Sequence, residues 1–251
     1  MAIQTEHSLQ LGVEIKKKLK EFDLDISFSA GKGCLGILGP SGCGKSMTLK
    51  SIAGIVTPDS GRIALQYAKG EAAGGRVLYD SALKINEKPQ MRRVGYLFQN
   101  YALFPNMTVR ENIAFAFGKE KEKDFLEELL ERFYLTEVAE LYPSVLSGGQ
   151  QQRTAMARML AAKPDVILLD EPFSALDSFL QQEMEREVQQ VLQSFGGVSI
   201  LVSHNKEEIF RLTQKCMVME RGKIAEIGDT KEIFAHPKTA EGRLLIQGGS
   251  L

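Results

Sequence analysis

The sequence predicts a mixed α/β fold: a largely parallel sheet flanked by helices, with an antiparallel β part at one edge and an inserted helical part. Two continuous apolar runs, at residues 166–169 and 198–202, are typical of central parallel strands that are buried on both faces. A Gly-rich turn at residues 39–44 joins a short apolar segment to a helical one. Together these features favour a core of alternating strands and helices.

The first third of the chain is expected to begin with sheet. Apolar residues alternate with polar ones from Phe22 to Phe28, so a strand there would place the apolar side chains on one sheet face. Residues 34–38 form a short apolar strand, and residues 46–54 have the pattern of a helix that ends at its glycine. The three segments predict a strand followed by a strand, loop and helix unit.

The rest of the chain supplies the other predicted elements. β-prone residues at 62–65 and 76–79 flank the Gly- and Ala-rich residues 69–75, which predicts an antiparallel ribbon with a variable loop. Residues 119–140 are charged and have a helical period, so they are expected to belong to a helical subdomain. Residues 180–195 form an amphipathic helix that two glycines close.

Charge and cysteine content exclude some classes of function. The chain of 251 residues is long enough for one large α/β domain, or for a core with an inserted subdomain. Its 31 Lys and Arg nearly balance 32 Asp and Glu, so we expect no nucleic-acid partner. Three widely spaced cysteines without metal-ligand spacing indicate a reducing, cytoplasmic compartment. No apolar run approaches the roughly 18 to 20 residues that span a bilayer, so any membrane connection is expected through a partner.

A phosphate-loop motif lies between a predicted strand and its helix. It matches G-x-x-x-x-G-K-[ST] with the residues Gly39, Pro40, Ser41, Gly42, Cys43, Gly44, Lys45 and Ser46. Glycines let successive amides point at phosphate oxygens, and the helix adds partial positive charge at its N-terminus. We expect Lys45 to neutralise β- and γ-phosphate oxygens and Ser46 to offer its hydroxyl to Mg²⁺. The predicted core is therefore a phosphate-loop (P-loop) NTPase of the RecA-like type.

Two acidic residues follow the apolar run at 166–169. Asp170 and Glu171 would stand at the C-terminal end of a buried strand, where open α/β sheets bind their ligands. We expect Asp170 to hold Mg²⁺ through water and Glu171 to orient and deprotonate the attacking water. Acidic strand ends before proline are also common as simple caps, so this interpretation depends on the phosphate loop beside them.

A second Gly-rich motif opens a later helix. Its residues are Leu146, Ser147, Gly148, Gly149 and Gln150, and an alanine-rich run to Ala162 follows. Ser147, Gly148 and Gly149 would present a second set of phosphate donors at a helix N-terminus. A single γ-phosphate cannot use both sets if they lie far apart on one subunit. We therefore expect a head-to-tail pair of chains that closes two shared sites.

The order of six motifs resembles that of the ATP-binding cassette family over nearly the whole chain. The motifs are the phosphate loop, Gln99 after a strand, the signature at 146–150, the Asp170–Glu171 pair, residues 174–177, and His204. The resemblance implies that ATP is hydrolysed with Mg²⁺ in a homodimer that sandwiches two ATP molecules.

The resemblance also implies roles for single residues and a division of the chain. Gln99 would sense Mg²⁺ and the transmembrane partner, Asp177 would link the two sites across the dimer, and His204 would contact the γ-phosphate. One nucleotide-binding domain would cover residues 1–251. Its core and β subdomain would take residues 1–98 and 163–251, and the helical subdomain with the signature would take 99–162.

Two positions depart from the family's usual pattern. Asn205 stands where many relatives have aspartate, which we expect to matter little for hydrolysis. Many relatives also stack the adenine on an aromatic residue before the phosphate loop, but residues 11–21 contain no aromatic. Phe22 is the nearest candidate, and its alternation with Leu24 predicts a core position, so the stacking residue stays unassigned.

Residues 98–113 are rich in aromatic and methionine side chains beside a loop, and they allow two interpretations. They form either the core of the helical subdomain or, as we favour, a groove that receives a short helix from a transmembrane subunit. The stretch resembles that of bacterial importer cassettes. That resemblance implies permease subunits, indirectly a substrate-binding protein, and a place at the cytoplasmic face of the membrane.

Residues 77–81 and 92–99 resemble the molybdate and sulfate branch of these importers, which implies an oxyanion such as molybdate, or sulfate, as the transported substrate. Two alternatives stay open: an ABC transporter ATPase for another substrate, and a soluble ABC ATPase that acts without a transporter. Soluble cassettes usually carry tandem cassettes or long coiled-coil insertions, and the sequence shows neither.

Overall fold

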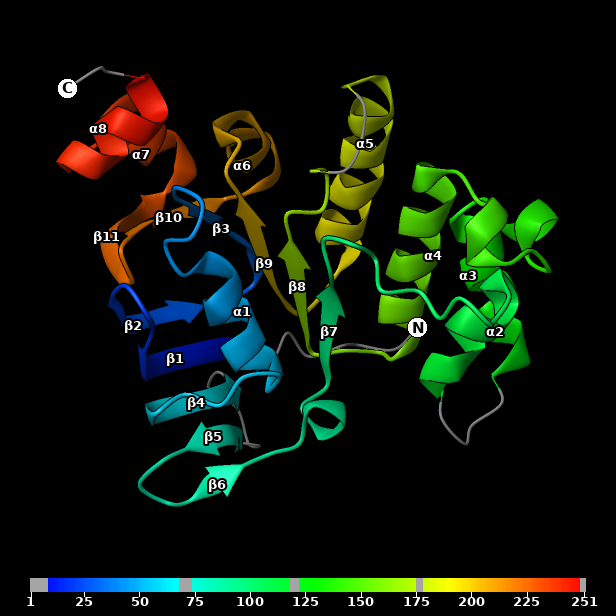
Figure 1. The fold of residues 1–251 in the computed structure, drawn as a ribbon, viewed down its shortest axis with the longest axis horizontal. Coiled ribbons are helices and arrows are strands. Elements are labelled where there is room, and N and C mark those ends of the chain that lie inside the picture. The colour runs from blue at the N-terminus through cyan, green and yellow to red at the C-terminus, as the bar shows by residue number, and fades with distance from the viewer. Residues whose placement is uncertain (1–8, 68–73, 118–121, 175–177, 249–251) are drawn as a thin grey trace, which may run out of the picture.

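The structure, a computed structural model, describes residues 9–67, 74–117, 122–174 and 178–248 (Figure 1). Parts of two predicted segments, the variable loop at 69–75 and the start of the segment at 119–140, lie outside these residues.

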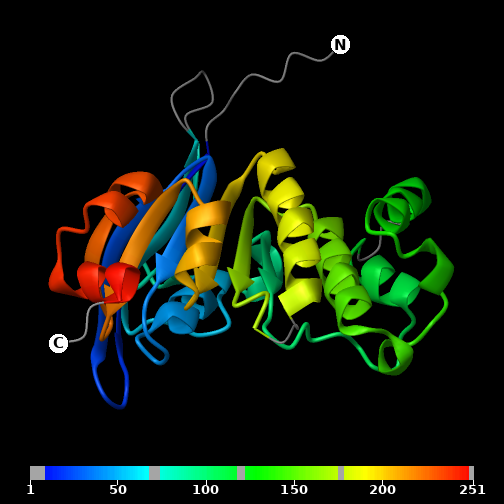
Figure 2. The same cartoon turned by 90° about the horizontal axis from the view of Figure 1, so that it is seen from above.

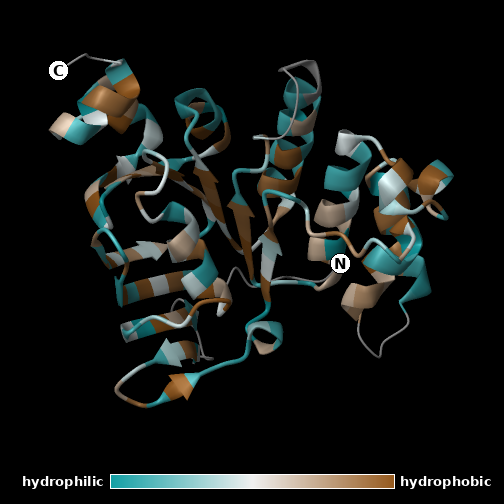
Figure 3. Cartoon of the chain, in the orientation of Figure 1, coloured by the Kyte–Doolittle hydropathy of each residue, from teal (hydrophilic) through white to brown (hydrophobic). Residues whose placement is uncertain are grey.

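A mostly parallel sheet forms the centre of the molecule. Its strand order is β11-β10-β3-β9-β8-β7, and all neighbours are parallel except β10 and β11. The strands are β3 (Gly33–Leu38), β7 (Val94–Leu97), β8 (Val166–Asp170), β9 (Val198–Ser203), β10 (Lys215–Glu220) and β11 (Lys223–Asp229). Every residue of β8 and β9 is buried, and Figure 3 shows both strands as largely hydrophobic. The predicted central parallel strands are confirmed.

An antiparallel sheet of order β2-β1-β4-β5-β6 packs beside the parallel one. Its strands are β1 (Leu9–Lys18), β2 (Asp23–Ala30), β4 (Ser60–Tyr67), β5 (Gly75–Asp80) and β6 (Ile85–Asn86). Alternate residues of β2, from Leu24 to Ala30, are buried, as period two requires. β4 and β5 pair antiparallel, which confirms the predicted ribbon.

Eight helices lie within the described residues. They are α1 (Lys45–Ala53), α2 (Val109–Ala114), α3 (Lys123–Arg132), α4 (Gly148–Ala161), α5 (Ser178–Ser194), α6 (Lys206–Leu212), α7 (Thr230–Ala235) and α8 (Ala240–Gln247). Short 3₁₀ turns occupy Pro89–Met91, Phe115–Phe117, Thr136–Val138 and Pro143–Val145. α1 ends at Gly54 as predicted, and α5 begins two residues before the predicted start. α3 is shorter than the periodic segment because Tyr134 adopts a left-handed φ of 54° and ends the helix.

Each face of the parallel sheet belongs to a different hydrophobic core. On β8, Ile167 and Leu169 join the core shared with α2–α6, whereas Val166 and Leu168 join the core shared with α1 and the antiparallel sheet. Figures 1 and 2 both show α5 between α6 and α4, with α2 and α3 beyond α4. The parallel sheet thus lies between α1 and the helices α2–α6. The phosphate loop, Asp170 and His204 lie at the C-terminal ends of its strands β3, β8 and β9.

Candidate functional site

The phosphate loop curls tightly between β3 and α1. A Cβ at Gly39 would lie 2.4 Å from the Met219 carbonyl oxygen, so only glycine fits there. Gly44 has a φ of 111° and forms the N-cap of α1, a conformation that side chains disfavour. The next three residues after Gly39, namely Pro40, Ser41 and Gly42, are exposed. The loop therefore offers exposed backbone at the start of a helix, as an anion site requires.

Lys45 holds its ammonium group over this loop. The side chain is only 4% exposed, and its Nζ donates hydrogen bonds to the carbonyl oxygens of Gly39 at 2.8 Å and Pro40 at 3.0 Å. Glu171 Oε1 lies 4.0 Å from the same nitrogen. A buried cation in contact with two carbonyls and one carboxylate oxygen provides a strong attraction for phosphate.

Asp170 lies at the end of β8, and each of its carboxylate oxygens accepts a hydrogen bond from a hydroxyl. Ser46 Oγ donates to Oδ1 and Tyr96 OH donates to Oδ2, both at 2.7 Å. Burial, and then the contact with Asp170, raise the pKa of Tyr96, so the phenol stays protonated and donates. Ser46 and Asp170, both expected to hold Mg²⁺, are thus in contact in the structure. The sequence analysis did not identify Tyr96 as a site residue, because its contact with Asp170 depends on the pairing of β7 with β8.

Glu171 occupies a strained turn directly after β8. Its φ is 46°, and its backbone N–H donates to the Val202 carbonyl of β9 at 3.0 Å, which ties the turn to the neighbouring strand. His204 follows β9, and its Nδ1 lies 3.2 Å from Glu171 Oε2. The structure thus brings Lys45, Glu171 and His204 into contact, from three motifs that are distant in the sequence.

The donor set at Ser46 and Asp170 fits Mg²⁺. This ion takes hydroxyl, carboxylate and water oxygens and completes its octahedral shell with substrate phosphates. Ser46 and Asp170 are already in contact at the mouth of the phosphate loop, where a β- or γ-phosphate would bind. Gln99, the third predicted ligand, is exposed and follows β7, the strand beside β8, so it lies at the same edge of the sheet.

A buried carboxylate lies behind His204. Glu208 of α6 accepts hydrogen bonds from Ser203 Oγ at 2.6 Å, Gln181 Nε2 at 3.0 Å and Asn205 Nδ2 at 3.2 Å. Burial raises the pKa of Glu208, and the Ser203 hydrogen bond opposes that rise. The Asn205 departure therefore has a physical consequence, because an ionised aspartate could not donate to this carboxylate.

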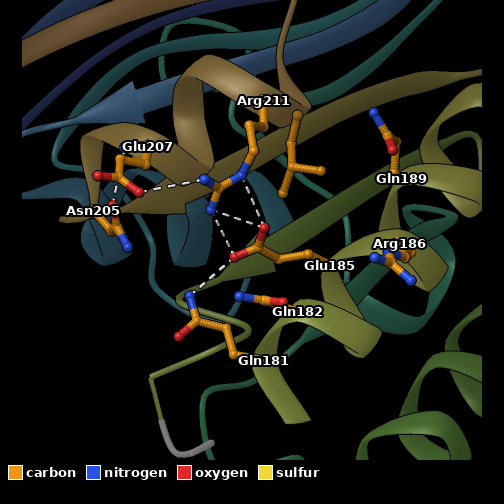
Figure 4. A pocket seen from close by; sticks show the side chains of 9 residues that line it. Gln181, Gln182, Glu185, Arg186, Gln189, Asn205, Glu207 and Arg211 are labelled. Atoms are coloured by element: carbon orange, nitrogen blue, oxygen red, sulfur yellow. Dashed lines mark hydrogen bonds and ion pairs between the residues drawn. The ribbon is translucent and has the colours of Figure 1, made fainter. Parts of the chain in front are cut away.

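The same network continues into a polar pocket between α5 and α6 (Figure 4). Glu185 of α5 accepts hydrogen bonds from Gln181 and from the Arg211 guanidinium of α6, each at 3.0 Å. Arg211 also donates to Glu207 at 3.3 Å. These contacts fix α6, and with it the turn that carries His204, against α5.

The signature residues are not brought to the phosphate loop of the same chain. Ser147 is exposed and caps α4: its hydroxyl accepts from the Gln150 N–H, and Gln150 Oε1 accepts from the Ser147 N–H. Gly148 is exposed, and Gly149 is buried. In Figures 1 and 2, α1 and α4 lie on opposite sides of β8. Asp177 lies outside the described residues.

The structure corrects the prediction for Phe22 and locates the Cys43 side chain and the aromatic stretch. Phe22 is not a core residue: β2 begins one residue later, and Phe22 is half-buried beside Gly44 of the phosphate loop. Cys43 points its thiol into the core beneath the loop, and burial raises its pKa. In the aromatic stretch at 98–113, Tyr101, Val109 and Ile113 are buried, whereas Phe104 and Met107 are partly exposed, so both interpretations stay open.

Comparison with known proteins decides the family. The sequence profile described as ABC transporter matches residues 22–174, which is more than half of the chain. The chain belongs to the ABC transporter family. It is 39% identical over 241 residues to a sulfate/thiosulfate import ATP-binding protein of Synechococcus elongatus, covering 91% of this chain and 66% of that protein. An Fe(3+) ions import ATP-binding protein of Haemophilus influenzae is also 39% identical, over 223 residues, with 86% and 61% coverage.

The fold agrees with this membership. A solved dimeric structure of the ATP-binding cassette MJ0796, bound to ADP and Pi after hydrolysis, has a TM-score of 0.69 and 25% identity, covering 88% of this chain and 98% of that one. The chain therefore has the ABC ATPase fold with its phosphate-loop NTPase core, and it carries the ATPase domain of the family. It spans 66% and 61% of the two import proteins named above. Within the described ranges, no helix is long and apolar enough to cross a membrane.

Proposed function

We propose that this chain binds and hydrolyses Mg-ATP as a homodimer and drives a membrane importer. The observation that carries the proposal is the convergence of Lys45, Ser46, Asp170, Glu171 and His204 at one edge of the parallel sheet. A buried ammonium, a hydroxyl–carboxylate pair and a second carboxylate are the groups that phosphoryl transfer to water needs.

Each residue has a separate task in this proposal. Lys45 and the amides of the phosphate loop bind the β- and γ-phosphates. Ser46, Asp170 and Gln99 would hold Mg²⁺, which would supply positive charge to stabilise the phosphate oxygens. Glu171 orients the attacking water and accepts its proton.

His204 positions Glu171 and the γ-phosphate relative to each other. Its Nδ1 already lies 3.2 Å from Glu171 Oε2. An imidazole N–H at Nε2 can donate to a phosphate oxygen. Such a contact would hold the geometry in which the water attacks, so His204 acts by positioning while Glu171 acts as the base.

The placement of the signature supports a homodimer. The residues Ser147, Gly148, Gly149 and Gln150 lie at the start of α4, where Ser147 and Gly148 are exposed, and α4 lies on the other side of β8 from α1. We infer that they bind the ATP held by a second copy, with Asp177 linking the two sites. We also propose that residues 99–162 form a helical subdomain that moves the signature, and that residues 1–98 and 163–251 form the core.

The transport role is supported by the relatives. The two relatives named above are import ATP-binding proteins, which supports permease subunits as partners, indirectly a substrate-binding protein, and a place at the cytoplasmic face of the membrane. For the substrate we propose an oxyanion, molybdate or sulfate. The sulfate/thiosulfate relative and the similarity at residues 77–81 and 92–99 support it, although an Fe(3+) relative is equally similar.

Replacing Glu171 by Gln tests the chemistry. The rate of ATP hydrolysis by Glu171→Gln is expected to fall about 10²- to 10⁴-fold, because the base is lost while the phosphate contacts stay. ATP affinity is expected to stay within a factor of about two. Glu140→Gln, at an exposed carboxylate paired with Arg110, is the matched control and is expected to keep the wild-type rate. Hydrolysis by Glu171→Gln at the wild-type rate would show that Glu171 is not the base.

Transport is tested separately with the permease subunits that co-purify with the chain and a binding protein, in vesicles. ATP-dependent uptake of sulfate or molybdate is expected with the wild-type chain and not with Glu171→Gln. Uptake of neither oxyanion, with hydrolysis intact, contradicts the substrate and leaves the ATPase proposal standing.

A further inference from the structure

We propose that Tyr96 is a positioning residue for the magnesium site: its hydroxyl holds the Asp170 carboxylate in the orientation that binds the metal together with Ser46. The inference rests on the proposed function and adds a residue outside the phosphate loop, the carboxylate pair and the signature. It is carried by the 2.7 Å hydrogen bond from Tyr96 OH to Asp170 Oδ2.

Strand register explains why Tyr96 reaches Asp170. β7 and β8 are parallel neighbours in which Tyr96 pairs with Leu168, two residues before Asp170. Because side chains two residues apart share a sheet face, Asp170 points to the same side as Leu168, toward α1 and Ser46. Tyr96 and Leu168 both pack in the core on that side, and the long phenol spans the remaining two-residue offset along the strands.

Tyr96 and Ser46 each donate a hydrogen bond to a different oxygen of the Asp170 carboxylate. Ser46 Oγ occupies Oδ1 and Tyr96 OH occupies Oδ2, so the plane of the carboxylate is fixed by two donors on different elements. The terminal torsion of aspartate is broad when nothing restrains it. Asp170 is only 6% exposed, so loss of the Tyr96 donor would leave Oδ2 buried without its partner from β7.

The phenol ring itself is held in place. The Tyr96 and Phe98 rings lie 4.4 Å apart between centroids, and Phe98 directly precedes Gln99, the third predicted magnesium ligand. Tyr96 thus connects the strand that ends before Gln99 to the Asp170 carboxylate. Partners of metal ligands that fix their orientation typically change metal affinity about 10- to 100-fold when removed.

The test is Tyr96→Phe, which deletes the hydroxyl and keeps the ring. ATP binding is titrated with Mg²⁺ using the full-length Glu171→Gln chain, so that no ATP is consumed. The Mg²⁺ concentration for half-maximal ATP binding is expected to rise about 10-fold in the Tyr96→Phe variant. ATP affinity in EDTA is expected to stay unchanged, because the phosphate loop is intact.

Tyr79→Phe is the matched control. The Tyr79 side chain is buried on β5, and its hydroxyl donates to the Pro58 carbonyl oxygen at 2.8 Å, not to Asp170. It is expected to keep the wild-type Mg²⁺ dependence. An unchanged Mg²⁺ midpoint in Tyr96→Phe, or an equal shift in Tyr79→Phe, overturns the role of Tyr96 and leaves the ATPase proposal intact. If the parent chain binds no ATP in the presence of Mg²⁺, the proposed function and this inference both fall.

Discussion

The two phosphate-binding motifs of this chain are built very differently. The side chains at the phosphate loop contact other motifs of their own chain: Lys45 is buried, Ser46 is bonded to Asp170, and Glu171 reaches both Lys45 and His204. In the signature, Ser147 and Gly148 are exposed at the start of α4, where the side chains of Ser147 and Gln150 each accept a hydrogen bond from the other's backbone N–H.

In the function proposed above, this difference gives the two motifs separate tasks. The phosphate loop and carboxylates would bind ATP and position water within one chain. The signature would complete a site for a nucleotide brought by another copy, since α1 and α4 lie on opposite sides of β8. Variants of the phosphate loop are therefore expected to change ATP binding by single chains. Variants of the signature are expected to change only dimerisation and the ATP hydrolysis that depends on it.

The largest expected effect beyond loss of Glu171 comes from the exposed motif. Ser147→Arg places a long side chain at the surface where the second ATP would dock. Hydrolysis is expected to fall at least about 100-fold, because transition-state contacts from the partner are lost. ATP binding by the single chain is expected to stay unchanged in a fluorescence titration. Ser29→Arg, at an exposed position of β2, is the control. Loss of ATP binding in Ser147→Arg would contradict the division of tasks.

A smaller effect, on ATP binding, is expected from a change in the phosphate loop. Lys45→Ala removes the ammonium that the loop holds, and hydrogen bonds to charged groups contribute about 1.5 to 3 kcal/mol. ATP affinity of the single chain is therefore expected to weaken about 10- to 150-fold. Lys50→Ala, in the last turn of the same helix, serves as control. Equal affinities for the two variants would show that Lys45 does not contact phosphate.

The smallest expected effect concerns the thiol beneath the loop. Because burial raises the pKa of Cys43, little thiolate forms near neutral pH, and maleimide labelling of the folded chain is expected to be slow. The rate is expected to rise with pH and to reach that of the urea-unfolded chain only above the ordinary cysteine pKa. Cys34 and Cys216, whose pKa values burial raises to about 12, are expected to react more slowly still.

Labelling of folded Cys43 at the unfolded rate near neutral pH would contradict this prediction. Because Cys43 belongs to the phosphate loop, a maleimide that does attach to it is expected to block ATP binding, and the Cys43→Ala variant is expected to resist that inhibition. Inhibition that persists in Cys43→Ala would show that the reagent acts elsewhere.

The sequence predicted the parts of the site that depend on local pattern. The phosphate loop between a strand and a helix, the central strands, the end of α1 at Gly54 and the start of α4 at the signature each depend on a few neighbouring residues, and the structure has them as predicted. Contacts that depend on strand register or helix packing could not be predicted. Tyr96 reaches Asp170 only because β7 pairs with β8, and Glu208 meets Gln181 only because α5 packs on α6.

Phe22 shows the limit of a periodic pattern. Its alternation with Leu24 predicted a core position, but alternation carries no information about where the strand begins. Phe22 lies just before β2, beside Gly44 of the phosphate loop.

The central claim, that each chain holds half of two shared sites, is tested most directly by measuring the mass of the Glu171→Gln chain with Mg-ATP in sedimentation velocity and native mass spectrometry. We expect a dimer that contains two ATP molecules, and an ATP-bound monomer when Ser147→Arg is added. A Glu171→Gln chain that stays monomeric with ATP bound, or a dimer that forms equally well with Ser147→Arg, would contradict the claim.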